Sequence, residues 1–504
     1  MISPDRARRL ALYLLLSLSL AYVLGASYVG LNGGQLWRQA DVYAHILGFA
    51  GIKGLVPFED FLGQRSVYDI PVYEYLIAKI AVLLQADALV ITRYVNAVLW
   101  LLTAHAGWRI VERFERHSGI FFLFLISTSP LVLHYFSVPM PDTMALALSM
   151  LALSMLLEPG LSGGRAALAC TLLGVAALIK SPVPFVFLVF YTTYLGAGAV
   201  AGREDAVLGL RAHWRRVTGP LLVALVCAVF AELLRNRILG QETVRFAQDP
   251  NWYFGTLELR TSAAFWTTML ERFRDASTRY CGYLYIALLL IASHPAFKVD
   301  RVAILAAVIA FLSGWLAFPL LYRVHDYYQL PGTIIAYMVI AMAARGVWTF
   351  ATGKLPPLAA GRIRGLEYEH ILVIGIACAA LVSTVVMRGI GEPARTSVYD
   401  ALEQALRNEQ RFLYVDDDVK FNDNIGPGIG GLAVTGFKQV NFQALELDCD
   451  RWVEEFRAVL VKGSSPCLTR HKHRGVYYFQ DAGYQFLLIE AQGEDGVTRR
   501  GAPP

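Results

Sequence analysis

The stretch GIFFLFLISTSPLVLHYFSVPMPDTMALALSMLALSMLLE, residues 119–158, indicates the class of fold. It contains two apolar runs, 119–136 and 142–158, which flank the short connection SVPMP at 137–141. A helix that crosses a bilayer needs about 17–25 apolar residues, and both runs have this length. The sequence therefore predicts two membrane-spanning helices joined by a short turn.

The composition extends this interpretation to the whole chain. Of its 504 residues, 56% are apolar and only 17% are charged, and the mean hydropathy is +0.46. A soluble globule of this size has more charged residues on its surface, and a disordered chain has fewer apolar residues, so the composition excludes both classes. The formal net charge of +5 is too small to indicate a nucleic-acid partner. Most of the chain is expected to lie in a membrane.

Eleven spanning helices are predicted in total. The nine further runs are 10–30, 89–111, 165–180, 183–201, 217–234, 281–294, 302–320, 328–345 and 370–388. The first run follows three arginines and resembles a signal peptide, but its poor cleavage site favours an uncleaved anchor. The run 72–84 contains Glu74 and Lys79 and is short, so it predicts an interfacial amphipathic helix and no span.

Loop charges predict a cytoplasmic N-terminus. The basic residues of the expected inner loops are Arg113, Arg116, Arg165, Arg203, Arg211, Arg215, Arg216, Lys298, Arg301, Arg345, Lys354, Arg362 and Arg364. The short outer connections 137–141 and 321–327 hold only Arg323. This asymmetry is the positive-inside pattern. The two long outer loops, 31–88 and 235–280, then place any chemistry outside.

The predicted fold class is an all-α polytopic membrane module, 1–388, followed by a small extracytoplasmic α/β domain, 389–504. Strand-like pieces in the tail are 411–416, 431–437, 476–480 and 485–490, and VEEFRAVLV (453–461) is predicted to be helical. Cys449 and Cys467 lie in this tail and are able to pair if it faces an oxidising compartment.

The first outer loop begins GGQLWRQADVYAHILGF (33–49), where Arg38 and His45 stand at i−3 and i+4 from Asp41. A carboxylate at the membrane face is suited to act as general base on an acceptor hydroxyl. Alternatively, Asp41 only pairs with Arg38 on the helix surface. Arg38 either contacts a phosphate oxygen or holds the loop on lipid headgroups.

Two further groups of polar residues lie on the same outer side. Arg65 and the segment YDIPVYEYL (68–76), with Tyr73 and Glu74, offer aromatic and charged side chains to a sugar, although tyrosines at this depth also serve as membrane anchors. Asp142 opens a span after two prolines, where it is a candidate site residue or merely caps the helix together with the following Thr.

Lys180 is the one charge between residues 166 and 202, and it either snorkels to the interface or binds an anionic headgroup. The turn YRVHDYYQLP (322–331) holds four more candidates. His325 and Asp326 are suited to orient a substrate, Arg323 to neutralise a phosphate, and Tyr328 to line the site, while an interfacial aromatic belt explains only the tyrosines.

No metal-binding motif was found in the sequence. It contains no HExxH, no pair of CxxC motifs and no Asp-x-Asp in the first outer loop. The Asp416–Asp418 run is typical of a solvated strand end. The sequence therefore predicts chemistry without a metal or another cofactor.

Together, WRQAD, the proline–tyrosine segment before the second span, PD at the start of a later span and HDYYQLP resemble bacterial integral-membrane glycosyltransferases of the GT-C class. The group most similar is that of protein O-mannosyltransferases and the lipid A aminoarabinose transferase. The resemblance covers about residues 10–345.

The resemblance implies transfer of a sugar from a polyprenyl-phosphate donor to a glycan, lipid or protein acceptor outside the bacterial inner membrane, usually with inversion. Carried over by motif, Asp41 would be the catalytic base and Asp142 the acid of the second outer loop. Arg38, Lys180 and Arg323 would face the donor phosphate, and His325 and Tyr328 would line the cavity. Relatives with paired acids differ here, because Val42 follows Asp41.

Other classes remain open at this point. A transporter or flippase of lipid-linked glycans would also have about 11–14 spans and a cationic cavity, although no internal repeat supports it. A membrane receptor or scaffold with an outer binding domain is the third alternative.

Overall fold

The structure is a computed structural model, and it describes residues 16–17, 19–24, 36–51, 70–158, 160–201, 218–219, 222–230, 233–234, 254–276, 300–353, 412–415, 437–440, 442–456, 458–481 and 484–489. The chain divides into two compact units. The first comprises Met1–Tyr28 and Ser66–Ile390, and the second comprises Val29–Arg65 and Gly391–Pro504. The boundary at Ile390/Gly391 lies two residues from the expected division at 388/389, and the segment Val29–Arg65 is grouped with the second unit.

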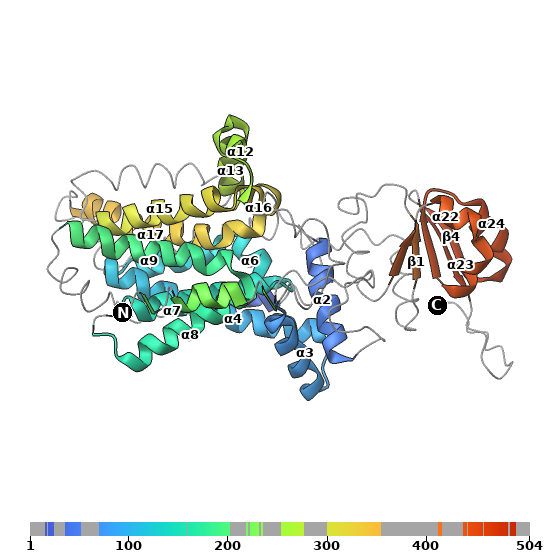
Figure 1. Ribbon diagram of the computed structural model, residues 1–504, viewed down its shortest axis with the longest axis horizontal. Coiled ribbons are helices and arrows are strands. Elements are labelled where there is room, and N and C mark those ends of the chain that lie inside the picture. Colours follow the sequence, from blue (N-terminus) through green and yellow to red (C-terminus); the bar gives the residue numbers. More distant parts are fainter. Residues whose placement is uncertain are drawn as a thin grey trace. The chain divides into compact units, whose positions relative to one another are not determined.

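The first unit is a bundle of long apolar helices lying side by side (Figure 1). Its main members are α4 (Ala88–Phe114), α7 (Pro141–Leu156), α8 (Gly163–Lys180), α9 (Pro182–Val200), α15 (Arg301–Ala317) and α17 (Gln329–Gly353). Helix α7 packs on α4 and α8, and α15 packs on α9 and α17. These helices lie over the predicted spans 89–111, 142–158, 165–180, 183–201, 302–320 and 328–345.

Four described helical segments are long and apolar enough to cross a membrane: α4, α8, α9 and Asp326–Phe350. The pair α5 (Gly119–Thr128) and α6 (Pro130–Ser137) adds a fifth if it is one broken span, while α7 and α15 are shorter apolar helices. The predicted spans 281–294 and 370–388, most of 10–30 and a minor part of 217–234 lie outside the described residues. The number eleven and the cytoplasmic N-terminus stay predictions.

The prediction of one continuous helix over 119–136 was wrong. Helices α5 and α6 meet at a bend of 65°. Ser129 between them has extended dihedral angles (φ −72°, ψ 117°) and caps α6 by accepting a hydrogen bond from the Val132 N–H. Pro130 follows at the first position of α6, and a proline disfavours helical geometry in the residue before it. The Ser129-Pro130 pair therefore accounts for the break between the two helices.

The short predicted helix at 72–84 is α3 (Val72–Leu84). One face, which includes Tyr73 and Ile77, is buried against the bundle, whereas Val82, Leu83 and Leu84 are exposed. Two smaller helices, α12 (Leu257–Thr261) and α13 (Ala263–Ala276), lie in the expected second outer loop. The turn from α15 to α17 contains α16 (Pro319–Val324) and the single 3₁₀ turn η4 (Asp326–Tyr328).

In the second unit, α2 (Leu36–Ala50) carries the first-loop motif, and the polar tail forms a five-stranded mixed sheet with the order β2-β1-β3-β5-β4. Strand β1 (Phe412–Val415) pairs in parallel with β2 (Phe437–Val440) and β3 (Ala458–Lys462). Strand β5 (Tyr484–Ile489) is antiparallel to β3 and to β4 (Gly475–Asp481). The helices are α22 (Phe442–Leu447), α23 (Cys449–Glu455) and α24 (Pro466–His471), and the 3₁₀ turn η5 (Lys472–Arg474) follows.

The prediction of a helix throughout 453–461 was half wrong. Helix α23 ends at Glu455, and Ala458–Lys462 form β3. This strand is central, pairing with β1 on one side and β5 on the other, and Val459 and Val461 are completely buried. Pairing on two sides and burial override the local helical pattern, as is usual for strand preferences.

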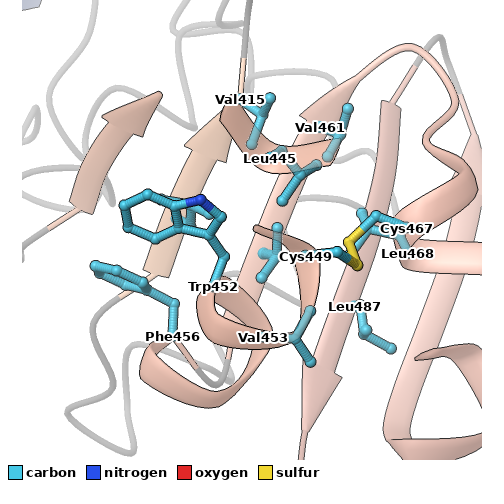
Figure 2. Packing of buried hydrophobic residues seen from close by; sticks show 12 residues of the cluster. Val415, Leu445, Cys449, Trp452, Val453, Phe456, Val461, Cys467, Leu468 and Leu487 are labelled. Carbon is cyan, nitrogen blue, oxygen red and sulfur yellow. A yellow bond between two sulfur atoms is a disulfide. The ribbon is translucent and has the colours of Figure 1, made fainter. Parts of the chain in front are cut away.

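Helices α23 and α24 cover the sheet through one apolar core (Figure 2). Trp452 and Phe456 lie next to each other in it, and the Trp452 indole N–H donates to the Ala444 carbonyl. Cys449 and Cys467 form a disulfide that joins the two helices. The pairing that the sequence permits is thus present.

Candidate functional site

The turn between α6 and α7 presents an acid at one end of the bundle. Pro141 takes the first position of α7, where its missing N–H costs nothing, and Asp142 follows it in the first turn. The N-cap residue is Met140, which makes no side-chain capping bond, so Asp142 is not the cap. Its side chain is buried, with 1% of the residue exposed. Positive potential at the helix N-terminus favours the charged carboxylate there.

A buried amide holds this turn in place. The Asn96 side chain on α4 donates to the Val138 carbonyl at 2.7 Å. Its Oδ1 accepts from the Tyr73 hydroxyl at 2.9 Å and from the Thr143 hydroxyl at 3.4 Å. Asn96 therefore connects α3 and α4 to the two sides of the turn that carries Asp142. Arg93, one turn earlier on α4, is also buried and its Nε lies 3.4 Å from the Ser137 carbonyl oxygen.

Tyr322 on α16 lies near Asp142. The side chain is completely enclosed and packs on Gly314 of α15, where a Cβ would meet its ring. Burial raises the pKa of the Tyr322 hydroxyl, and the charge of Asp142 raises it further. The phenol therefore stays neutral beside the acid. The Gln329 Nε2 lies 3.5 Å from the Tyr322 carbonyl oxygen, and the Gln329 Oε1 accepts a hydrogen bond from the Trp315 indole N–H at 2.9 Å. Gln329 therefore ties α15 to the start of α17.

Lys180 ends α8 among aromatic rings. Its residue is 5% exposed, and its ammonium lies 5.3 Å from the ring centroid of Tyr328 and 5.9 Å from that of Tyr327. Tyrosine faces attract a cation at this distance. His325 stacks on Tyr327 with centroids 5.2 Å apart. A cation, two tyrosines and a histidine are thus gathered where α8 meets η4.

Asp326 belongs to the same cluster. It accepts a hydrogen bond from the Tyr135 hydroxyl of α6, and Tyr135 stacks edge-on against Tyr327. Arg272 of α13 is close enough that its charge interacts with both. Burial lowers the pKa of Arg272, while Asp326 and Tyr135 oppose this effect. Elements from three places in the sequence, α6, α13 and η4, therefore meet at one carboxylate.

In the second unit, Asp41 is buried on α2. Arg38 donates to its Oδ2 at 2.8 Å, and the His45 Nε2 lies 3.9 Å from its Oδ1. The two neighbours that the helical spacing indicates are therefore in place. A carboxylate held between a guanidinium and an imidazole is oriented, and its charge is stabilised.

The remaining predicted site residues have less direct positions. Arg323 is exposed on α16, and Arg65 lies outside the described residues. Tyr73 is completely buried with its hydroxyl on Asn96, so it supports the turn. Its contact with a substrate stays a prediction. Glu74 beside it is buried as well.

Sequence reasoning missed Tyr135, Arg272, Asn96 and Tyr322. Three of them had a signal in their position, because Tyr135 lies two residues before the connection 137–141, Tyr322 begins the quoted turn 322–331, and Arg272 lies in the outer loop 235–280. Asn96 is a polar residue inside a predicted span, where polar side chains usually have a structural or functional role.

Among the described residues, the group able to hold a metal ion is Cys449, Asp450 and His471 in the second unit. The Cys449 sulfur is in the disulfide, and His471 lies 2.7 Å from Asp450. In this state the group offers one imidazole and one carboxylate, which is fewer ligands than a structural metal site has.

The bundle with its broken α5–α6 pair and a polar cluster at one end has the GT-C fold of membrane glycosyltransferases. The resemblance seen in the sequence is confirmed at this level, and the protein is an integral membrane protein.

One solved structure with this fold is ArnT from Cupriavidus metallidurans bound to undecaprenyl phosphate, with a TM-score of 0.61 and 14% identity over 98% of this chain and 99% of ArnT. The archaeal oligosaccharyltransferase AglB from Archaeoglobus fulgidus, with an inhibitory peptide and a dolichol-phosphate, has a TM-score of 0.52 and 11% identity over 97% of this chain and 74% of AglB.

Arabinofuranosyltransferase AftD from Mycobacteria has a TM-score of 0.51 and 16% identity, and the match covers 95% of this chain but 40% of AftD. No protein-family model matches the chain, and no curated protein matches it. Likeness at these identities establishes the fold, and the reaction is a separate question.

Proposed function

We propose that the protein transfers a sugar from a polyprenyl-phosphate donor to a hydroxyl of a cell-envelope glycan, lipid or protein, with inversion. The observation that carries this proposal is the fold shared with ArnT over nearly the full length of both chains, since that structure holds undecaprenyl phosphate. A fold is a weak guide to substrate, so the donor class rests on this likeness together with the chemistry of the cluster.

Lys180 is the first candidate to bind the donor phosphate. As the phosphate leaves the sugar, negative charge grows on its bridging oxygen, and a nearby cation stabilises that charge without transferring a proton. Lys180 is buried beside Tyr327 and Tyr328 at the end of α8, where low polarity strengthens its attraction for an anion. Arg38 and Arg323 are the other two candidates from the sequence.

Asp41 is proposed as the base that takes the proton of the acceptor hydroxyl. General-base catalysis contributes about 10²–10⁴-fold, and the base is needed only as the proton leaves. Asp142, with the neutral Tyr322 near it, is proposed to position donor or acceptor hydroxyl groups. His45, Glu74, His325, Asp326 and Tyr328 are proposed to contact the substrates, and no metal is assigned a role.

The proposed orientation puts these residues on the extracytoplasmic face of the bacterial inner membrane, with the N-terminus inside and the sheet domain outside. The Cys449–Cys467 disulfide supports this, because disulfides persist in oxidising compartments. The lipid phosphate then lies at headgroup depth while its prenyl chain stays in the hydrocarbon.

The test uses the purified full-length protein in liposomes with a radiolabelled polyprenyl-phosphate sugar and an envelope extract as acceptor. Label that moves to a new acceptor supports transfer, and label that changes leaflet with its bond intact indicates a flippase. Asp41→Asn should reduce transfer by about 10²–10⁴-fold. Full activity of this variant would exclude Asp41 as the base.

Lys180→Met should strongly reduce transfer, and Lys79→Met is the matched control because Lys79 is exposed on α3, where its ammonium lies over the Tyr75 ring. Equal activities of the two variants would remove Lys180 from the phosphate site. Retained transfer after treatment with EDTA is expected, and a loss restored by a divalent cation would contradict the metal-free proposal.

A further inference from the structure

A cluster of charged side chains lies at the other end of the bundle. Glu158 follows α7, and its Oε1 accepts from the Arg109 Nη2 at 2.6 Å and from the Arg113 Nη2 at 3.0 Å. Its Oε2 accepts from Arg165 in the first turn of α8. One carboxylate therefore holds three guanidinium groups, and Arg113 also donates to the Ser154 carbonyl.

The cluster has an excess of positive charge. Among the described residues, Glu158 is the acid with which these three arginines form ion pairs, so the group carries a net charge of +2. Glu112, in the last turn of α4, accepts from the Trp108 indole and from the backbone N–H groups of His117 and Gly119. Its side chain therefore bonds the turn that follows α4.

The side chains are arranged with the acid inside and two of the bases outside. The Glu158 side chain is 10% exposed, whereas those of Arg109 and Arg165 are 47% and 64% exposed. A guanidinium has five N–H donors, and Arg109 and Arg165 each give one to Glu158. A Cβ added at Gly163 or Gly164 would meet nothing within 4 Å, so the space beside this turn of α8 is open.

The position along the bundle sets the depth of this cluster. Helix α7 begins next to Asp142 and ends two residues before Glu158, and α8 runs from the cluster to Lys180. The 16 residues of α7 span about 24 Å, close to the roughly 30 Å hydrocarbon thickness of a bilayer. With the Asp142 end at one membrane face, the arginine cluster lies at headgroup depth of the opposite leaflet.

We propose that Arg109, Arg113 and Arg165 bind the phosphate of an anionic phospholipid in the leaflet opposite the candidate active site. The placement in that leaflet rests on the proposed function. Arginine forms bidentate hydrogen bonds with phosphate oxygens, and the basic cluster attracts anionic headgroups at the membrane surface. Glu158 holds the three guanidinium groups together, and the single negative charge of the lipid phosphate lowers the net charge of the cluster from +2 to +1.

The binding test uses full-length protein in a mild detergent, titrated with short-chain phosphatidylglycerol, phosphatidylcholine or inorganic phosphate, and native mass spectrometry counts the bound lipid. Phosphatidylglycerol should bind at least ten-fold more tightly than phosphatidylcholine. Arg109→Gln/Arg165→Gln should lose about ten- to thirty-fold of that affinity. Arg451→Gln/Arg470→Gln removes the same charge from exposed sites of the second unit and should bind normally.

Glu158→Gln distinguishes a lipid site from a purely structural ion-pair cluster. It leaves all three arginines and raises the net charge to +3, so phosphatidylglycerol should bind more tightly although the protein loses stability. Unchanged lipid preference in Glu158→Gln and in the double arginine variant would overturn the proposal. Competition by inorganic phosphate as strong as that of the lipid would show a free-anion site and overturn the lipid assignment.

Lipid binding is measured without sugar transfer, so the two proposals fail separately. Selective phosphatidylglycerol binding without label transfer would contradict the glycosyltransferase function alone. Label transfer with no lipid selectivity would contradict the lipid site alone.

Discussion

Replacing Asn96 with alanine should loosen the turn that presents Asp142. The change removes the 2.7 Å bond to the Val138 carbonyl and the 2.9 Å bond from the Tyr73 hydroxyl. A buried polar group left without its partner costs about 1–3 kcal/mol. The Tyr73 hydroxyl keeps its contact with the Met140 backbone, so we expect a total of about 2–4 kcal/mol.

The assay is hydrogen–deuterium exchange of the full-length protein in nanodiscs, followed at the amides of 137–143. A loss of about 2–4 kcal/mol should raise the rate of exchange through local opening by about 30- to 1,000-fold. Sugar transfer should fall with it if Asp142 acts as proposed. Exchange is compared at one pH and one lipid composition, because both affect the rate.

Thr103→Ala is the matched control on the same helix. Thr103 is also completely buried, but its hydroxyl donates to the Leu99 carbonyl one turn earlier on α4. Its loss should leave exchange at 137–143 unchanged. If Asn96→Ala exchanged at the rate of this control, Asn96 would not hold the turn and the reasoning would be refuted.

Three further outcomes test other parts of the structure. Gly314→Ala places a methyl group against the buried ring of Tyr322 and should lower stability by about 1–3 kcal/mol, measured as a lower melting temperature. Gly196→Ala has open space beside it and should leave the melting temperature unchanged. Replacing Cys449 and Cys467 with serine opens a link across 18 residues, and denaturant unfolding of the sheet domain should show a loss of about 3 kcal/mol; an unchanged midpoint contradicts this. Burial raises the pKa of Glu158, but its three arginines lower it more, so the pKa lies below its usual value of 4.5. The ion pairs therefore stabilise the protein fully above that pH and are lost as the pH falls below it. The melting temperature of the wild-type protein should fall further between pH 6 and 3 than that of Glu158→Gln, and parallel curves would refute this.

Helix positions in the bundle were largely predictable from the sequence. Apolar runs such as 89–111 and 183–201 differ by three residues or fewer at each end from α4 and α9. A long apolar run leaves a membrane chain little choice, because every backbone polar group in the hydrocarbon must be bonded internally. The break at Ser129 was signalled by Pro130 but hidden by the continuous hydropathy of the run.

The candidate site was predictable only in part. Arg38, Asp41 and His45 follow from helical spacing, because residues three and four apart share one face. The bond from Tyr135 to Asp326 joins residues 191 positions apart, and no local pattern indicates such a contact. The burial of Tyr73 likewise depends on α4, since its partner Asn96 lies on that helix.

The sequence by itself determined that most of the chain lies in a membrane, because composition and apolar run length report how the chain divides between lipid and water. The GT-C class was indicated only by the resemblance of a few motifs, and the fold confirmed it. Tertiary structure alone decided which polar groups meet at the ends of the bundle. It also decided that Ala458–Lys462 are a strand, although the local pattern favoured a helix. The reason is that local preferences amount to a few tenths of a kcal/mol per residue, whereas pairing and burial contribute more and depend on distant partners.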